Sequence, residues 1–434
     1  MTNPVHIHFS LKEGNIGIIE FDLQGKPVNL LSPEVLEELS QVLDSLREPD
    51  PPEGLIFLSR KKDSFIGGAQ IEPEKLFKNR DETVRFIQTG RDLFDQIANL
   101  PFPTLAAVHG PALGGGLELA LACRYRMASS HPRTRLGLPE VMLGILPAWG
   151  GTTRLPRLVG LQSALDLLLT GKQVSPKQAL RMGLIDRVAT TENIGPQARV
   201  FMRQIIETGP GFQEKIRRAR GRSRKGTSTW FLDKTRPGRA MVFSKARQTV
   251  LARTRGHYPA PIKILEVVKK GLSLPVARAL PLEQGAMEAL MEEETTRNLM
   301  HVFALQMGAG KGLPKSESAP GGKTPSLEKI GVLGGGAMGS GIAQWILGRG
   351  LQVRLKDINE AAVGNGIRTI HQLFDTLVSR RRLTLFEKEE KLHRLSSTTA
   401  YSGFKSCGLV IEAVAEKLDI KKSVIRELQD KAGS

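Results

Sequence analysis

The chain has 434 residues, more than one ordinary hydrophobic core accommodates, so two or three domains are expected. Its composition, 40% apolar and 24% charged, is that of a globular protein. No apolar run approaches the roughly 20 residues that cross a bilayer, and no basic segment precedes an apolar stretch at the N-terminus, so neither a membrane span nor a secretory signal is expected. The only cysteines, Cys123 and Cys407, lie far apart. That spacing argues against a disulfide framework and favours a reducing, cytoplasmic location.

The net charge of +18 is concentrated in one region. Between Glu214 and Gly256, 14 Lys and Arg residues stand against two acids. Such a region can bind nucleic acid, acidic phospholipid or an anionic substrate, or it can be a solvated basic surface. Few aromatic residues lie among the basic ones, which disfavours nucleic acid as a partner.

The N-terminal part of the chain alternates strands with helices. Apolar runs over Val5–Phe9 and Ile16–Phe21 predict two strands separated by a turn. Ser32, followed by proline, predicts the start of a helix with one apolar stripe. Short buried strands are expected at Leu55–Leu58 and Leu105–Val108. This order predicts an α/β domain with crossover connections.

The pattern changes after about Pro196. From there to Met307 helical periodicity dominates, including Ala260–Gly271 and Leu282–Gln306. Residues 308–325, rich in Gly, Pro, Ser and Lys, predict a flexible linker. A second α/β pattern begins at Ile330.

A glycine-rich turn joins a strand to a helix at residues 109–118, HGPALGGGLE. Three successive glycines allow a close approach of backbone and ligand. The N–H groups at a helix start favour negative charge, so a thioester oxygen that becomes an enolate would be stabilised there. Glu118 would lie within reach of the same ligand. The alternative is a packing turn with a surface glutamate.

A second carboxylate follows in Leu138-Pro139-Glu140, shortly before Gly150 and Gly151. Alone, this segment is a weak signal. With the glycine turn and residues 65–69, FIGGA, it has the order and spacing of the crotonase (enoyl-CoA hydratase/isomerase) family, which the chain resembles closely over residues 5–190. The resemblance implies a crotonase-type ββα spiral domain at residues 1–195, followed by a helical, basic extension at 196–307.

The resemblance also implies roles for individual residues. The backbone N–H groups of Gly67 and Gly115 would form an oxyanion hole, and Glu118 and Glu140 would hold a water between them. Two close carboxylates share a proton, so such a pair can act as acid and base together. Residues expected at the coenzyme A moiety are Gly68, Ala69 and Gln70.

Members of this family with both glutamates are hydratases, which makes hydration of a 2-enoyl-CoA the expected reaction. The alternatives are Δ3,Δ2-enoyl-CoA isomerisation through Glu140, and a non-catalytic assembly subunit. The chain departs from the family pattern at two positions, with Gly67 where alanine is usual and Gln70 where aspartate is usual.

A dinucleotide-binding pattern begins at the strand Lys329–Leu333, followed by 334–339, GGGAMG, and a helix. Asp357 ends the next predicted strand, about 20 residues on, which completes the context of a Rossmann fingerprint. The pyrophosphate would lie on Gly334, Gly336, Ala337, Met338 and Gly339 at the helix start. Asp357 would bind the ribose hydroxyls, which favours NAD over NADP.

Residues 326–434, including 409–416, LVIEAVAE, resemble the NAD-binding domain of 3-hydroxyacyl-CoA dehydrogenases. The resemblance places Glu416 and Lys421 near the nicotinamide half of NAD. The whole order resembles the bifunctional α-subunits of fatty-acid oxidation complexes, which implies an oligomer, a thiolase partner and peripheral membrane contact. Relative to that family the sequence stops inside a partial Rossmann domain, before the catalytic His–Glu pair, so hydride transfer by this chain alone is not expected. His6 and His8 lack further ligands nearby, and no metal is expected.

Overall fold

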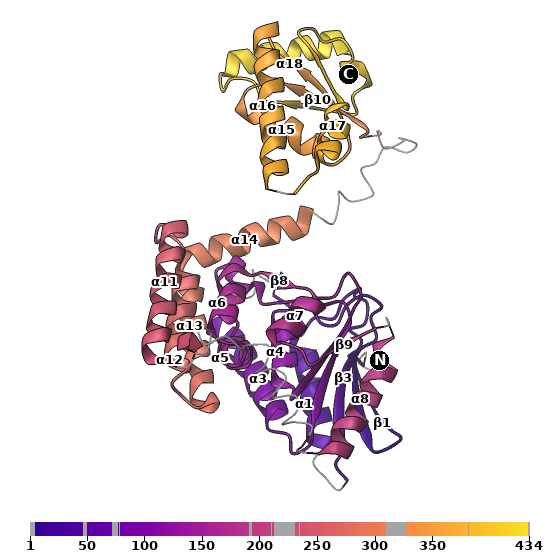
Figure 1. Cartoon of the computed structure of the whole chain (residues 1–434), viewed down its shortest axis with the longest axis vertical. Helices are drawn as coiled ribbons and strands as arrows, with labels where there is room; N and C mark the ends of the chain where they lie inside the picture. Colours follow the sequence, from indigo (N-terminus) through magenta and orange to yellow (C-terminus); the bar gives the residue numbers. More distant parts are fainter. Residues whose placement is uncertain are drawn as a thin grey trace. The chain divides into compact units, whose positions relative to one another are not determined.

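The structure is a computed structural model, and it describes residues 5–46, 50–71, 77, 79–190, 193–209, 211, 231–233, 235–309, 327–380 and 382–432. The chain divides into two compact units, Met1–Gly312 and Leu313–Ser434 (Figure 1). None of the described helices is both long and apolar enough to traverse a bilayer.

The first unit is built on a six-stranded sheet. In spatial order its strands are β1 (Ile7–Lys12), β2 (Ile16–Phe21), β3 (Gly54–Ser59), β4 (Thr104–Val108), β6 (Tyr125–Ser129) and β9 (Arg187–Ala189). Only the β1–β2 pair is antiparallel. A tight turn joins that pair. Its residues Gly14 and Asn15 have positive φ angles of 80° and 49°, which glycine and asparagine adopt with little steric penalty.

Alternate side chains of the central strands enter two hydrophobic clusters, because successive residues of a strand point to opposite faces. Ile19 and Phe57 belong to the larger cluster, whereas Ile18 and Ile56 belong to the smaller one, which the helix α8 (Ile194–Thr208) covers with Phe201. Both faces of the sheet are therefore buried, as expected for parallel strands linked by helices.

The remaining elements on the larger cluster surround the glycine turn. They are α1 (Pro33–Ser45), α3 (Arg80–Ala98), α4 (Gly115–Ala122), the 3-10 helix η1 (Pro139–Leu143), α5 (Gly151–Val159), α6 (Leu161–Thr170) and α7 (Pro176–Met182). A small sheet of order β5 (Pro111–Leu113), β7 (Arg135–Gly137), β8 (Gln173–Val174) lies among them. Isolated parallel bridges pair Leu31 with Ala69 and Ile66 with Ala112, which places the loop 65–70 beside β5.

A helical extension completes the first unit. It consists of α11 (Arg236–Thr254), α12 (Pro259–Gly271), α13 (Val276–Glu292) and α14 (Glu294–Ala309). The helix expected over 282–306 is two helices, since the backbone at Glu293 is extended (ψ 131°). Helices α11, α12 and α13 pack on α5, α6 and α3 (Figure 1). Residues 214–230 of the basic region and the linker from 310 to 326 lie outside the described residues.

The second unit is a parallel sheet of order β12-β11-β10-β13. Its elements are β10 (Lys329–Leu333), α15 (Ala337–Gly348), β11 (Gln352–Lys356), α16 (Glu360–Ser379), α17 (Leu385–Leu392), β12 (Leu395–Thr398), the 3-10 helix η3 (Phe404–Ser406), β13 (Leu409–Glu412) and α18 (Leu418–Ala432). The chain builds outward from β10 to β12 and then crosses to β13 on the other side. Ligands of doubly wound sheets bind at the carboxyl ends of the strands where the order reverses, here β10 and β13.

Candidate active site

Glu118 lies in the first turn of α4, a helix whose eight residues are all buried. Its side chain is 3% exposed. The carboxylate oxygen Oε1 accepts hydrogen bonds from the backbone N–H groups of Trp149 and Gly151, both at 2.8 Å. Burial raises the pKa of Glu118 well above its usual range, the charges of Glu140 and Glu283 add to the rise, and the two N–H donors oppose it.

Glu140 lies in η1 and is 9% exposed. Its Oε2 atom is buried and has no hydrogen-bond partner among the described residues. Burial raises the pKa of Glu140 to about 8. A buried polar atom without a partner is rare in folded proteins, so this oxygen marks the place where a polar ligand or water fits.

The helical extension holds the segment that carries Glu140. The hydroxyl of Tyr258 donates to the carbonyl oxygen of Val141. Thr296, at the start of α14, donates its hydroxyl to the carbonyl oxygen of Gly144 at 2.8 Å. Val141 lies within η1 and Gly144 caps its end, so the position of Glu140 depends on residues more than one hundred positions away in the sequence.

The expected oxyanion donors need one correction. The N–H of Gly67 donates to the carbonyl oxygen of Asn29 at 2.8 Å, so it is already used and is not available to a thioester. The N–H of Leu31 donates to Gly68 O and the N–H of Gln70 donates to Leu31 O, both at 2.9 Å. Because neighbouring residues of an extended segment point to opposite sides, the N–H of Ala69 faces away from Leu31. No described residue accepts a hydrogen bond from that N–H.

Gly115 carries the second candidate donor. It is the first residue of α4, and its N–H has no acceptor among the described residues. The two donor segments approach closely because Gly68 lacks a side chain, since a Cβ there would lie 3.3 Å from the carbonyl oxygen of Leu113. Gly68 also has a φ of 126°, which L side chains rarely adopt. Ala69 and Gly115 thus present two unused backbone N–H groups beside the paired carboxylates.

The second unit arranges the predicted dinucleotide fingerprint. Gly334 has a φ of 99°, and its carbonyl oxygen would lie 1.8 Å from a Cβ at Gly339, so only glycine fits at 339. Gly336, Ala337 and Met338 are exposed at the start of α15, where N–H groups attract phosphate. These residues fit the pyrophosphate of a dinucleotide.

Acidic and basic side chains surround that helix start. Asp357 directly follows β11 and accepts the N–H of Gly335 at 2.7 Å. After β13, the ammonium group of Lys421 pairs with Glu412 at 2.9 Å and with Glu416 at 3.2 Å. Asp357 therefore lies next to the glycine turn, where the ribose of a dinucleotide would be.

The comparisons with known proteins agree with this geometry. The sequence profile of the family "Enoyl-CoA hydratase/isomerase" matches residues 13–252, more than half of the chain. The chain belongs to the enoyl-CoA hydratase/isomerase family. The profile "3-hydroxyacyl-CoA dehydrogenase, NAD binding domain" matches residues 329–434. The predicted fold class, a crotonase-type α/β domain with a helical region followed by a Rossmann-type parallel sheet, is confirmed.

Individual relatives match most of the chain. "Fatty acid oxidation complex subunit alpha" of Shewanella frigidimarina is 35% identical over 423 residues, which are 97% of this chain and 58% of that protein. The chain thus spans less than two thirds of that relative. Among solved structures, an enoyl-CoA hydratase from Mycobacterium avium subsp. paratuberculosis K-10 is 18% identical with a TM-score of 0.48, covering 70% of this chain and 96% of that one. One from Bacillus anthracis is 24% identical with a TM-score of 0.43, covering 71% and 97%.

Two residues of this enoyl-CoA hydratase/isomerase site were missed by the sequence interpretation. Trp149 is 4% exposed, and its ring meets Phe86 and Phe94 edge-on, at centroid distances of 5.3 and 5.4 Å. A Cβ at Gly115 would lie 2.6 Å from that ring, so the indole packs directly against the candidate donor Gly115. The second residue, Glu283, is fully buried on α13. The sequence signal that could have indicated its burial is the position of this glutamate within the apolar stripe of α13.

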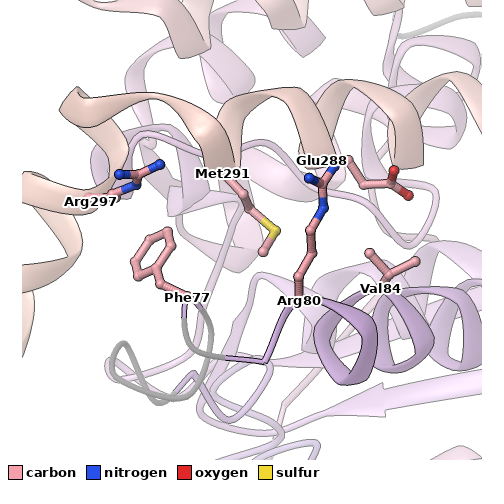
Figure 2. A pocket seen from close by; sticks show the side chains of 6 residues that line it. All are labelled: Phe77, Arg80, Val84, Glu288, Met291 and Arg297. Atoms are coloured by element: carbon pink, nitrogen blue, oxygen red, sulfur yellow. The ribbon is translucent and has the colours of Figure 1, made fainter.

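A pocket of about 320 Å³ opens between α3 and the extension helices α13 and α14 (Figure 2). The side chains that line it are Phe77, Arg80, Val84, Glu288, Met291 and Arg297. In Figure 2 the side chains of Met291 and Arg80 point toward each other from the two sides. None of the lining residues belongs to the catalytic or coenzyme A set expected from the sequence.

A group of Asp63, His109 and His131 lies at the carboxyl ends of β3, β4 and β6, with ligand atoms within 4.8 Å of one another. Asp63 pairs with Arg133 at 2.8 Å. Nδ1 of His109 is 2.9 Å from the hydroxyl of Ser129. These partners account for the arrangement of Asp63 and His109. The expectation that the chain binds no metal stays a prediction.

Proposed function

We propose that the first unit adds water across the double bond of a 2-trans-enoyl-CoA thioester to give a 3-hydroxyacyl-CoA, as a step of fatty-acid β-oxidation. The observation that carries this proposal is the juxtaposition of two buried glutamates with raised pKa values and two unused backbone N–H groups. Family membership and the fatty-acid oxidation complex relatives support the substrate class.

In this mechanism the thioester oxygen accepts hydrogen bonds from the N–H groups of Ala69 and Gly115. They stabilise the negative charge that develops when C3 is attacked. Glu118 and Glu140 hold one water between them. As the water oxygen bonds to C3, one carboxylate takes a water proton and the other carboxyl group delivers a proton to C2. The product has the composition of substrate plus water, with one proton supplied by one carboxyl group while the other carboxylate keeps the water proton.

The environments of the two glutamates suggest how the proton is shared. Burial raises the pKa of Glu118 as well, but the two N–H donors on its Oε1 oppose that rise and favour the ionised form. Glu140 has an oxygen without a partner and a pKa of about 8, which keeps it protonated at neutral pH. We therefore assign the base to Glu118 and the proton donor to Glu140. Gly68, Ala69 and Gln70 are proposed to contact coenzyme A, because they form the loop that carries the Ala69 donor.

For the second unit we propose NAD binding at Gly334, Gly336, Ala337, Met338 and Gly339, with Asp357 at the ribose and Glu416 and Lys421 at the nicotinamide side. NAD accepts a hydride when it is bound. The exposed helix start and the glycine geometry support this assignment. The loss of dehydrogenase activity in this chain, a thiolase partner, membrane contact, oligomer formation and a cytoplasmic location stay predictions.

Two alternatives rest on particular features. Isomerisation of 3-enoyl-CoA needs a single proton shuttle, and the unpartnered oxygen of Glu140 suits that role. A docking subunit would use the basic residues of α11, among which Lys245 and Arg247 are exposed. The first alternative keeps activity without Glu118, and the second needs neither glutamate.

The deciding experiment follows the conjugated enoyl absorbance of crotonyl-CoA with the full chain, Glu118→Gln and Glu140→Gln. We expect hydration by the parent and a loss of roughly 10²–10⁴-fold in kcat for each variant, because each removes one acid or base function. A folded but inert parent would overturn the proposal. A Glu118→Gln variant that still isomerises 3-enoyl-CoA at the parental rate would favour the isomerase.

A further inference from the structure

One short backbone segment serves two buried carboxylates. The N–H groups of Trp149 and Gly151 donate to Glu118, as described above. Those of Gly150 and Thr153 donate to Glu283, at 2.7 and 2.6 Å. The N–H groups of residues 149, 150, 151 and 153 thus alternate between a glutamate of α4 and a glutamate of α13. All lie at the start of α5, where N–H groups lack partners within the helix and attract negative charge.

Glu283 is built into this position. Its side chain is 0% exposed, and it accepts a third hydrogen bond, from the hydroxyl of Thr152 at 2.6 Å. A buried carboxylate is strongly unfavourable unless hydrogen bonds and charges compensate it. Three donors and the nearby guanidinium of Arg154 provide that compensation. Arg154 also donates to the carbonyl oxygen of Trp149 at 3.0 Å, so the segment is fixed from both its N–H and its C=O sides.

The charges around the two glutamates are few. Glu118 faces the carboxyl groups of Glu140 on η1 and Glu283 on α13, and both raise its pKa. Glu283 faces Arg154 and Arg157 of α5. Arg154 in turn pairs with Asp95 of α3 at 3.0 Å. Glu283 is therefore placed to influence Glu118 both through the shared backbone and through its charge.

We propose that Glu283 is a positioning residue for the hydration reaction: it fixes the segment 149–153 so that the N–H groups of Trp149 and Gly151 hold the carboxylate of Glu118 in its working position. The helical extension is by this inference part of the catalytic apparatus. The inference rests on the proposed hydratase function.

The test compares Glu283→Gln and Glu283→Asp with the parent full chain, using crotonyl-CoA over a range of pH. For Glu283→Gln we expect kcat to fall by roughly 10–100-fold with KM little changed, because a small misplacement of a catalytic group acts on kcat. Removing the charge of Glu283 lowers the pKa of Glu118, so the limb of the pH profile that reports Glu118 moves to lower pH. Glu283→Asp keeps the charge and shortens the side chain, so kcat should fall while that limb stays in place.

The control is Glu266→Gln, which removes an exposed carboxylate of α12 that pairs with Lys263 at 3.6 Å. It should leave kcat and the pH profile unchanged. Circular dichroism and thermal unfolding check that each variant folds. The inference is overturned when Glu283→Gln behaves like this control, or when its kcat falls with no movement of the pH limb.

A second readout needs no substrate and separates this inference from the hydratase proposal. The carboxyl carbon of Glu118 is followed by ¹³C NMR in glutamate-labelled protein, with Glu118→Gln for assignment. Titration of that signal at lower pH in Glu283→Gln supports the coupling even when crotonyl-CoA is not hydrated. An unshifted titration contradicts the coupling, whatever the activity.

Discussion

The backbone N–H of Gly114 donates to the carbonyl oxygen of Gly137 at 3.0 Å, and this bond joins the two segments that carry the candidate catalytic glutamates. Gly114 is the residue before α4, the helix of Glu118, and Gly137 ends β7 shortly before Glu140. The bond continues the parallel pairing of β5 with β7. The distance between the two carboxylates is therefore set by a sheet, which holds geometry more firmly than a free loop.

Substitution of Gly114 tests that relationship. Gly114 has a φ of 51°, and a Cβ there would lie 2.9 Å from Oε1 of Glu140. Gly114→Ala should therefore displace the Glu140 carboxylate and lower kcat for crotonyl-CoA by roughly 10–100-fold. We expect an accompanying loss of about 1–3 kcal/mol in the free energy of unfolding from backbone strain. Gly285→Ala is the matched control, because a Cβ at that helical, exposed position meets nothing within 4 Å. Equal activity of the two variants would contradict the prediction.

Gly67→Ala separates the two possible donors of the oxyanion hole. A Cβ at Gly67 would make only an ordinary contact, 3.4 Å from Leu30, and the bond from the Gly67 N–H to Asn29 would be kept. Because the proposed donor is the N–H of Ala69, kcat should stay within about twofold of the parent, and stability should rise by about 0.4–1 kcal/mol. Steady-state kinetics and urea unfolding measure the two effects. A large fall in kcat would return the donor role to Gly67.

The raised pKa of Glu140 predicts a pH-dependent stability. Burial raises its pKa from 4.5 to about 8, so between these values the folded chain binds a proton that the unfolded chain has released. Stability from this group is therefore full at low pH and falls as the pH rises from 4.5 to 8, by about 1.4 kcal/mol for each pH unit in that range. Glu140→Gln lacks this loss and should be more stable than the parent at about pH 8.5, above the raised pKa. Thermal unfolding of both proteins across this range should show that the stability advantage of Glu140→Gln over the parent becomes smaller toward low pH. A stability advantage that is the same at every pH would refute the explanation.

Local sequence signals predicted several elements well. The Ser32 side chain accepts the N–H of Val35, and α1 begins at Pro33, as the capping residue and the proline indicate. Strands β2 and β10 have the predicted bounds, because apolar runs between turn residues determine short buried strands. The two candidate catalytic glutamates and the candidate dinucleotide turn were predicted from motifs whose residues are close in sequence.

Features that depend on distant residues were not predicted. The N–H of Gly67 is used by Asn29 through a pairing that no local pattern shows. Glu283 reaches a segment 130 residues away, and its helical periodicity gives no sign of the partner. The break at Glu293 was also missed, since glutamate is a good helix former and gives no local sign of the extended backbone there.

The glycine turn of the second unit yields a sharp test of NAD binding. A Cβ at Gly339 would lie 1.8 Å from the carbonyl oxygen of Gly334, a backbone atom that cannot move aside without changing the turn that receives the pyrophosphate. Gly339→Ala should therefore weaken NAD binding by the full chain at least tenfold, or about 1.4 kcal/mol, in a calorimetric titration. Gly341→Ala, two residues further along the same helix, adds a Cβ that meets nothing within 4 Å and should bind NAD like the parent. Equal binding by both variants would mean that NAD does not use this turn, whereas a loss in Gly341→Ala as well would point to a general effect on α15 and not to contact with the pyrophosphate.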